Sequence, residues 1–156
     1  MVEIIAALNE RNGLNMLVHE VATRKESLFH EHLPQIKAIP EVLEHLLAQH
    51  GRIPFVVVSG SRRSSVVGSL SALGLLDKFD TIVSAEDYTN SKPAGDAFLL
   101  AAERLGVAPE DCLVFEDTEL GIQAATAAGM ASVRVPIPAK TSAQHRDEGT
   151  NGTCPS

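Results

Sequence analysis

Residues 112–130 read Cys-Leu-Val-Phe-Glu-Asp-Thr-Glu-Leu-Gly-Ile-Gln-Ala-Ala-Thr-Ala-Ala-Gly-Met. The apolar residues at the start predict a buried strand, and the small residues that follow predict a helix packed closely against it. Glu116 and Asp117 fall between the two, at the carboxyl end of the strand. Ligands of open α/β sheets bind at that edge, and paired carboxylates there suit a hard cation such as Mg²⁺. Acidic residues after a strand also serve as plain helix caps, so this segment alone leaves both interpretations open.

Residues 53–63, Ile-Pro-Phe-Val-Val-Val-Ser-Gly-Ser-Arg-Arg, repeat the arrangement of a strand followed by a helix. The β-branched run predicts a strand over residues 53–58, and we expect the helix to open near Ser61. The first turn of a helix presents unpaired N–H groups and the positive end of the helix dipole, which favour an anion. Ser59 and Gly60 are therefore candidates to bind phosphate, although a Ser-Gly pair after a strand is also typical of an ordinary turn.

A third strand is predicted over residues 81–86, and it leads to Lys92 and Pro93 just before another helix. Proline favours an extended conformation in the residue that precedes it. Lys92 would then reach over the edge of the sheet as a compact cation that neutralises phosphate. A surface lysine is usually only solvated, but three polar features that follow strands in this order favour a shared site.

Together these segments resemble motifs two, three and four of the haloacid dehalogenase superfamily. The resemblance rests on Ser59, on the Lys92-Pro93 pair and on the Val-Phe-Glu-Asp run that ends at Asp117. It extends from about residue 39 to residue 135 and is greatest for the β-phosphoglucomutase-like sugar-phosphate phosphatases. The resemblance implies an α/β fold in which helices flank a Rossmann-like parallel sheet. The alternation of predicted strands and helices indicates the same class.

The resemblance also implies the chemistry of the site. Asp117 would bind Mg²⁺ directly, with Glu116 in or beside its coordination sphere. Ser59 and Gly60 would hold two phosphoryl oxygens, and Lys92 would counter the charge shared by the phosphate and an attacking carboxylate. Ser59 and Lys92 are thus the candidate catalytic residues. The implied substrate is a small phosphorylated metabolite, such as a sugar phosphate, hydrolysed through an aspartyl-phosphate.

One part of the implied machinery is not found in the sequence. The resemblance implies a nucleophilic Asp and an acid/base Asp at the end of a first strand near the N-terminus, whereas the first Asp here is Asp77. Residues 147–150, Asp-Glu-Gly-Thr, resemble that signature faintly, but the polar sequence before them cannot form a buried strand. We therefore expect a C-terminal portion of the fold, with the central strand missing and two strand pairs facing a gap. Such open edges would accept a missing N-terminal segment or a second copy of the chain.

The N-terminal residues 1–35 are expected to form part of a helical cap, with helices over residues 2–10 and 14–33. The resemblance implies that Arg24 or Lys25 faces the substrate. A solvated helix face explains either residue taken singly.

Residues 36–138 are expected to form the α/β core, and residues 139–156 a disordered tail. The remaining core elements are predicted as helices over residues 40–49, 62–73, 95–105 and 119–129, and as a last strand over residues 131–135. Gly95 stands where the superfamily usually has proline, which predicts a looser start of the helix that follows Lys92.

The composition narrows the choice of partners. The chain has 156 residues, 44% of them hydrophobic, and a net charge of −7. The acidic balance argues against nucleic acid and anionic membranes, because both attract clustered Lys and Arg. We expect a cytoplasmic protein, since the sequence shows no signal peptide, no long apolar span and no disulfide framework around Cys112 and Cys154. Glycine-rich nucleotide loops and a serine-hydrolase elbow are also absent from the sequence.

Two hypotheses from different classes follow. In the first, the chain is part of a Mg²⁺-dependent phosphatase and needs a nucleophile that it does not itself contain. In the second, it is a non-catalytic phosphate-binding or assembly module.

Overall fold

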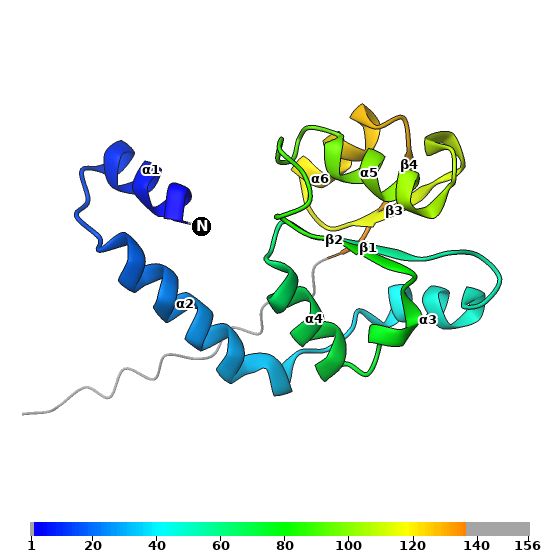
Figure 1. The fold of residues 1–156 in the computed structure, drawn as a ribbon, viewed down its shortest axis with the longest axis horizontal. Helices are drawn as coiled ribbons and strands as arrows, with labels where there is room; N and C mark the ends of the chain where they lie inside the picture. The colour runs from blue at the N-terminus through cyan, green and yellow to red at the C-terminus, as the bar shows by residue number, and fades with distance from the viewer. Residues whose placement is uncertain (1, 137–156) are drawn as a thin grey trace, which may run out of the picture.

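A computed structural model describes residues 2–136 of the chain (Figure 1). Helices and parallel strands alternate over the second half of this range, which confirms the predicted α/β class. The helices are α1 (Val2–Asn12), α2 (Val18–His32), α3 (Pro40–Gln49), α4 (Arg63–Ala72), α5 (Asp96–Leu105) and α6 (Glu119–Ala127). The strands are β1 (Val56–Val58), β2 (Thr81–Val83), β3 (Leu113–Glu116) and β4 (Ala131–Arg134), and short 3₁₀ turns cover Leu33–Gln35, Leu76–Lys78 and Pro109–Asp111.

The four strands form two separate parallel pairs. β1 pairs with β2, with Val57 opposite Ile82, and β3 pairs with β4, with Val114 opposite Ser132. Within residues 2–136, the second edges of β1 and β3 pair with no strand. The expected arrangement of two strand pairs is therefore present.

Helix α5 packs against both strand pairs and so joins them. Its residues Ala97 and Ala101 pack with Val83 of β2, and its residues Phe98 and Ala102 belong to the cluster around β3 and α6. Side chains next to each other along a helix point in different directions, so one helix can cover both pairs. The alanines let α5 and α6 approach closely, which favours dense packing.

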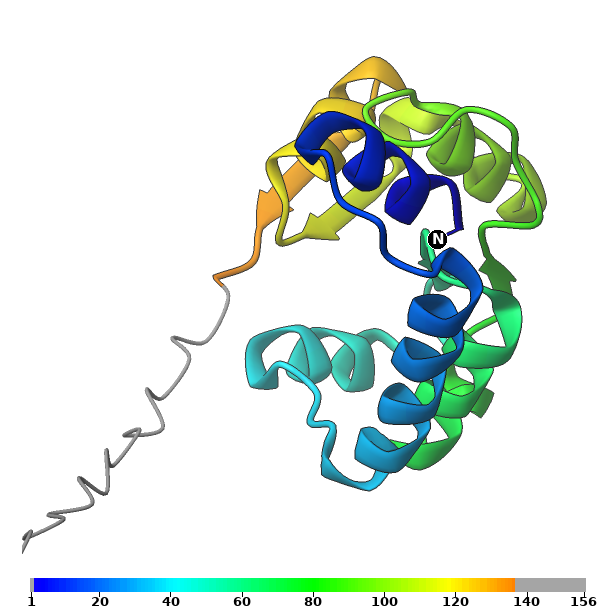
Figure 2. The same ribbon diagram turned by 90° about the vertical axis from the view of Figure 1, so that its left-hand side faces the viewer.

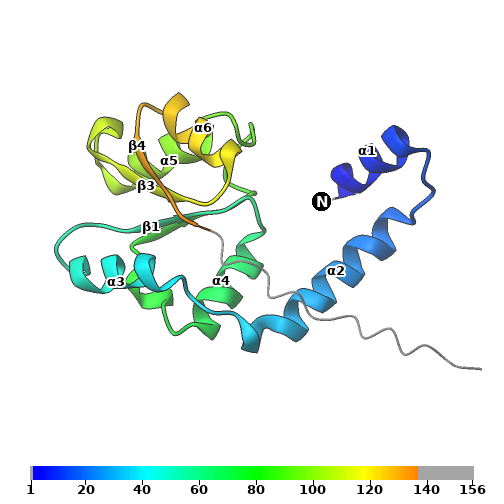
Figure 3. The same ribbon diagram turned by 180° about the vertical axis from the view of Figure 1, so that it is seen from behind.

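The N-terminal helices lie apart from the strands (Figures 1 and 3). Figure 2 shows α2 running beside α4, where the Ser65 hydroxyl donates to a carboxylate oxygen of Glu26 over 3.1 Å. Both helices were expected within residues 1–35, but α2 begins at Val18 rather than at residue 14. The reason is the side-chain amide of Asn9, which pairs with both the N–H and the carbonyl of Met16 and so holds the preceding segment out of the helix.

Two strands are shorter than the sequence predicts. β1 begins at Val56 because Pro54 has no N–H and the amide of Phe55 donates to the Asp80 carboxylate over 2.7 Å. β2 ends at Val83 because the next amide, that of Ser84, donates to a side-chain carboxylate instead of continuing the ladder.

Gly95 has a packing role that the sequence did not indicate. It is buried at the start of α5, and a Cβ added there would lie 2.9 Å from the backbone nitrogen of Ala128. The absence of a side chain therefore allows the start of α5 to lie against the end of α6. This close packing gives no support to the prediction that Gly95 loosens the start of α5.

The boundaries of the expected cap and core stay predictions, and the expected disordered tail over residues 139–156 lies outside the described residues. Among residues 2–136, every helix is too short or too polar to cross a lipid bilayer.

Candidate functional site

Lys92 and Glu116 meet at the carboxyl ends of the strands. The Lys92 Nζ lies 2.5 Å from Oε2 of Glu116, and the two side chains are only 20% and 10% exposed. The other carboxylate oxygen accepts from the amide of Thr118 over 3.2 Å and from its hydroxyl over 2.7 Å. Burial opposes ionisation of Glu116, but the Lys92 ammonium and the Thr118 donors outweigh it, so its pKa lies below the ordinary value of 4.5.

The start of α6 is built around this carboxylate. Thr118 caps the helix by accepting from the amide of Gly121 over 3.0 Å, while its own donors bind Glu116. A Cβ at position 121 would overlap the Glu116 carboxyl group, so a side chain at that position is incompatible with this arrangement. Glu116 thereby also lies near the positive end of the α6 dipole, which favours its ionised form.

Lys92 is held from a second side by the core. Its Nζ lies 5.0 Å from the ring centroid of Phe98, a buried residue of α5. A cation over an aromatic face is attracted by the ring. The ammonium is thus fixed at the edge of the β3 pair rather than free in solvent.

Ser59 lies in the turn that follows β1. Its amide donates to the Val83 carbonyl over 2.9 Å and extends the β1–β2 ladder by one bond. Its Oγ accepts from the amide of Ser61 over 3.1 Å, and the Ser61 carbonyl accepts from the amide of Ala85 over 3.0 Å. The turn containing Ser59 and Gly60 is therefore tied to the loop that leads from β2 to Lys92.

The first amide of α4 is already occupied. The helix begins at Arg63 rather than near Ser61, and the Arg63 N–H donates to both Glu86 carboxylate oxygens, at 3.0 and 3.3 Å. The expected anion site at this helix start is thus partly filled by the chain's own carboxylate. The amide of Gly60 and the hydroxyl of Ser59 remain as donors for an external phosphate.

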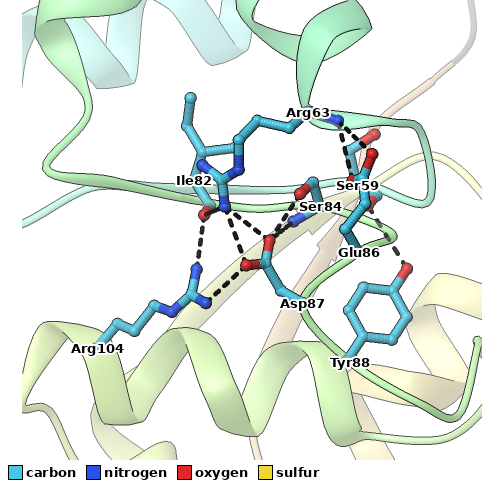
Figure 4. Close-up of polar contacts among 8 residues, drawn as sticks. All are labelled: Ser59, Arg63, Ile82, Ser84, Glu86, Asp87, Tyr88 and Arg104. Atoms are coloured by element: carbon cyan, nitrogen blue, oxygen red, sulfur yellow. Dashed lines mark hydrogen bonds and ion pairs between the residues drawn. The ribbon is translucent and has the colours of Figure 1, made fainter.

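Asp87 anchors the same loop through two arginines (Figure 4). One oxygen accepts from Arg104 over 2.8 Å, and the other accepts from Arg63 over 2.7 Å and from the amide and hydroxyl of Ser84. Both guanidinium groups also donate to the Ile82 carbonyl of β2, at 3.1 and 2.8 Å. The hydrogen bonds from Arg104 and Ser84 hold the pKa of Asp87 well below its ordinary value of 3.8.

Sequence reasoning missed this network. The only trace of the network in the sequence is the acidic pair Glu86-Asp87, which begins three residues beyond the end of β2. The arginines that complete the network lie on α4 and α5, 24 residues before and 17 residues after Asp87.

Asp117 faces a different environment from its neighbour Glu116. It is exposed, and no hydrogen bond or ion pair joins its side chain to another residue of the range 2–136. It lines a groove of about 350 Å³ whose walls are otherwise apolar, contributed by residues such as Leu43, Leu46 and Phe115. The groove is flanked by α3, α4 and β3. The Phe115 ring, which lines it, also lies 5.5 Å from the His45 ring of α3.

The two predicted metal ligands differ in their availability. Both oxygens of Glu116 are engaged by Lys92 and Thr118, whereas the Asp117 carboxylate is open. Among residues 2–136, no three His, Cys, Asp or Glu side chains gather in a way that would hold a metal ion. Mg²⁺ commonly takes one or two carboxylates and completes its shell with water and phosphate oxygens. Asp117 fits that role as a single carboxylate ligand.

Arg24 and Lys25 lie on α2. Arg24 pairs with Glu31 over 3.4 Å in an exposed contact. Within the described residues, neither basic side chain bonds to Ser59, Lys92 or Asp117, and their role toward a substrate stays a prediction.

Comparisons with known proteins agree with these features. A family model for haloacid dehalogenase-like hydrolases matches residues 1–135. The chain is 40% identical over 133 residues to fructose-1-phosphate phosphatase YqaB of Escherichia coli K12, across 85% of this chain and 70% of that protein. It is 30% identical over 130 residues to a phosphorylated carbohydrates phosphatase of Thermotoga maritima, across 83% of this chain and 59% of that protein.

Among solved structures, a β-phosphoglucomutase from Clostridium difficile matches with a TM-score of 0.75 and 27% identity, across 87% of this chain and 64% of that one. The chain therefore spans 59% to 70% of the length of these three relatives. The similarity includes the β-phosphoglucomutase-like branch that the sequence motifs indicated. The chain belongs to the haloacid dehalogenase-like hydrolase family.

Proposed function

We propose that this chain supplies the phosphate- and Mg²⁺-binding part of a phosphatase acting on a small sugar phosphate. The observation that carries the proposal is the meeting of Lys92 and Glu116 beside Asp117, at the end of β3. The similarity to a fructose-1-phosphate phosphatase and to a phosphorylated carbohydrates phosphatase supports the substrate class.

Each candidate residue has a role that its surroundings favour. The Ser59 hydroxyl and the Gly60 amide would bind phosphoryl oxygens, and the Lys92 ammonium would offset their charge. Glu116 would act through Lys92, by holding the ammonium in place. Asp117 would hold Mg²⁺, which when bound neutralises phosphate charge that otherwise repels an anionic nucleophile.

Hydrolysis needs two further groups, the nucleophilic carboxylate and the acid/base residue that the resemblance implies. A carboxylate would attack phosphorus and form an acyl-phosphate bond while the P–O bond to the sugar breaks, and the acid/base residue would protonate the departing sugar oxygen. Water, which gives its proton to the same residue, would then cleave the acyl-phosphate bond and release inorganic phosphate. We propose that a strand lying between β1 and β3 brings this carboxylate to the shared edge. The apolar groove and the open edges of both strands support this position. A preceding segment of the protein would supply such a strand, because a second copy of the chain has the same sequence and lacks that carboxylate too. Self-association through the open strand edges stays a separate prediction.

Phosphate binding by the chain tests the proposal. With Mg²⁺, isothermal titration calorimetry should show inorganic phosphate binding to the 156-residue chain. Asp117→Ala should lose most of the Mg²⁺-dependent part, and Asp111→Ala, which removes an exposed carboxylate elsewhere, should keep it. Binding that is absent, or that is unchanged in Asp117→Ala, contradicts the proposal.

The second candidate, a non-catalytic phosphate-binding or assembly module, is favoured by the separation of the two strand pairs. Metal-dependent hydrolysis of p-nitrophenyl phosphate by the chain alone would eliminate it. A cytoplasmic location and the exclusion of nucleic acid and membranes rest on the composition and stay predictions.

A further inference from the structure

The Tyr88 hydroxyl reaches the candidate phosphate-binding turn. It donates to the Ser59 carbonyl over 3.5 Å and lies 3.7 Å from the point where a Cβ on Gly60 would stand. Figure 4 shows the ring extending from the loop after β2 toward Ser59. Tyr88 is not among the candidate phosphate- or Mg²⁺-binding residues.

Peptide geometry makes this contact informative. The carbonyl of Ser59 and the N–H of Gly60 belong to one planar trans peptide, so they point in opposite directions. A donor fixed on the carbonyl side therefore fixes the direction of the N–H on the other side. Gly60 has no Cβ to limit rotation of this peptide, so the orientation depends on outside contacts.

We propose that Tyr88 is a positioning residue that holds the Ser59–Gly60 peptide so that the Gly60 N–H faces the phosphoryl group. The inference rests on the proposed function and assigns to that site a residue outside its motifs. A hydrogen bond to the carbonyl also polarises the peptide and makes its N–H a better donor.

The surroundings of Tyr88 suit a fixed donor. Its ring packs against the cluster formed by Val83, Ala97 and Ala101. The two residues before it are held by charged contacts. The Glu86 carboxylate accepts from the first amide of α4, and the Asp87 carboxylate pairs with Arg63 and Arg104. Burial, together with the nearby negative charge of Asp87, raises the pKa of Tyr88 above its ordinary value of 10.0, so the hydroxyl keeps its proton near neutral pH.

The test removes only the hydroxyl. Tyr88→Phe keeps the ring in its apolar cluster, and Thr126→Val is the matched control, because the Thr126 hydroxyl also donates to a backbone carbonyl, over 3.0 Å, but on α6. In the ligand-free chain, the amide resonance of Gly60 in ¹H–¹⁵N spectra should shift in Tyr88→Phe and not in Thr126→Val. With Mg²⁺, inorganic phosphate should bind about twofold to threefold more weakly to Tyr88→Phe, the lower end of the range for one hydrogen bond, because 3.5 Å is long for an O–H···O contact.

The outcomes separate the two claims. If wild type binds phosphate and Tyr88→Phe binds it equally well, the inference is overturned while the proposed function stands. An unmoved Gly60 resonance in ligand-free Tyr88→Phe overturns the inference whether or not phosphate binds. If wild type binds no phosphate, the proposed function fails and the inference fails with it. Equal loss of affinity in Thr126→Val also overturns the inference, because the effect would then not be specific to the turn.

Discussion

The carboxyl group of Glu116 occupies the space that a Cβ on Gly121 would need. This relationship links the strand end to the helix start, because Glu116 bonds to Thr118, and Thr118 in turn caps α6 through the Gly121 amide. It also fixes the partner of Lys92. The Lys92–Glu116 ion pair therefore requires a glycine at position 121, although the sequence shows Gly121 only as one of several small residues in a helix.

Gly121→Ala should therefore displace Glu116 and weaken its ion pair with Lys92. We expect a loss of about 1–3 kcal/mol in the free energy of unfolding, typical of overpacking at a close contact. Urea denaturation measures the loss, and phosphate binding should fall in the same variant. A matched control is Gly68→Ala, because Gly68 also lies within a helix but its Cβ would make an ordinary 3.5 Å contact with Leu33. That change should be neutral or stabilising, by up to about 1 kcal/mol, and equal losses in both variants would contradict the account.

Gly95→Ala tests the contact between α5 and α6. A Cβ there would press on the backbone of Ala128, which cannot move as a flexible side chain does. The expected cost is again about 1–3 kcal/mol in the free energy of unfolding. Thermal unfolding followed by circular dichroism should show a lower midpoint than wild type. A midpoint equal to that of Gly68→Ala would show that the close approach is not required.

The Lys92–Glu116 pair should make stability depend on pH in the acid range. The pKa of Glu116 in the folded chain is below 4.5, so the pair stabilises the fold above pH 4.5 and this contribution is lost as the pH falls below that value. Glu116→Gln should therefore be less stable than wild type at pH 7, and the difference should shrink on acidification. Urea unfolding at pH 3, 5 and 7 measures it. A difference that stays constant or grows toward pH 3 would contradict the ion pair.

Asp87→Asn should also lower stability most at neutral pH, through a set of contacts separate from the Lys92–Glu116 pair. The lowered pKa of Asp87 means that its bonds to Arg63, Arg104 and Ser84 stabilise the fold above pH 3.8 and weaken as the pH falls through the lowered value. The variant should lose stability at neutral pH, with a smaller loss under strongly acidic conditions. Asp111→Asn, an exposed position, serves as the control and should change little. A loss in Asp87→Asn that is independent of pH would rule out the charge as its cause.

Local patterns in the sequence predicted most of the fold. Apolar and β-branched runs, with glycine after helices, located α3 and α5 within a residue and identified every strand. The errors arose where a polar side chain took the place of a backbone hydrogen-bond partner. Hydrogen bonds between the Asn9 side chain and the Met16 backbone make α2 begin later than predicted, and the hydrogen bond from the Ser84 amide to Asp87 makes β2 end earlier. Such contacts depend on the folded arrangement and leave no periodic signal.

The candidate site was predicted less completely than the fold. The motifs indicated Lys92 and Glu116 as neighbours of one site, and the structure brings them together. They did not indicate that Lys92 neutralises Glu116 before any phosphate arrives, or that Glu86 takes the first amide of α4. Tyr88 belongs to no motif, and only its position beside Ser59 points to it.

A crystal structure of the chain with tungstate and Mg²⁺ would show directly whether Ser59, Lys92 and Asp117 share one phosphate site. Tungstate is a tetrahedral anion that mimics phosphate and is readily located by its scattering. We expect one anion bound by the Ser59 hydroxyl, the Gly60 amide and the Lys92 ammonium together, with Mg²⁺ between that anion and Asp117. Anions that bind Ser59 and Lys92 at separate places, or a metal ion bound away from Asp117, would contradict this expectation.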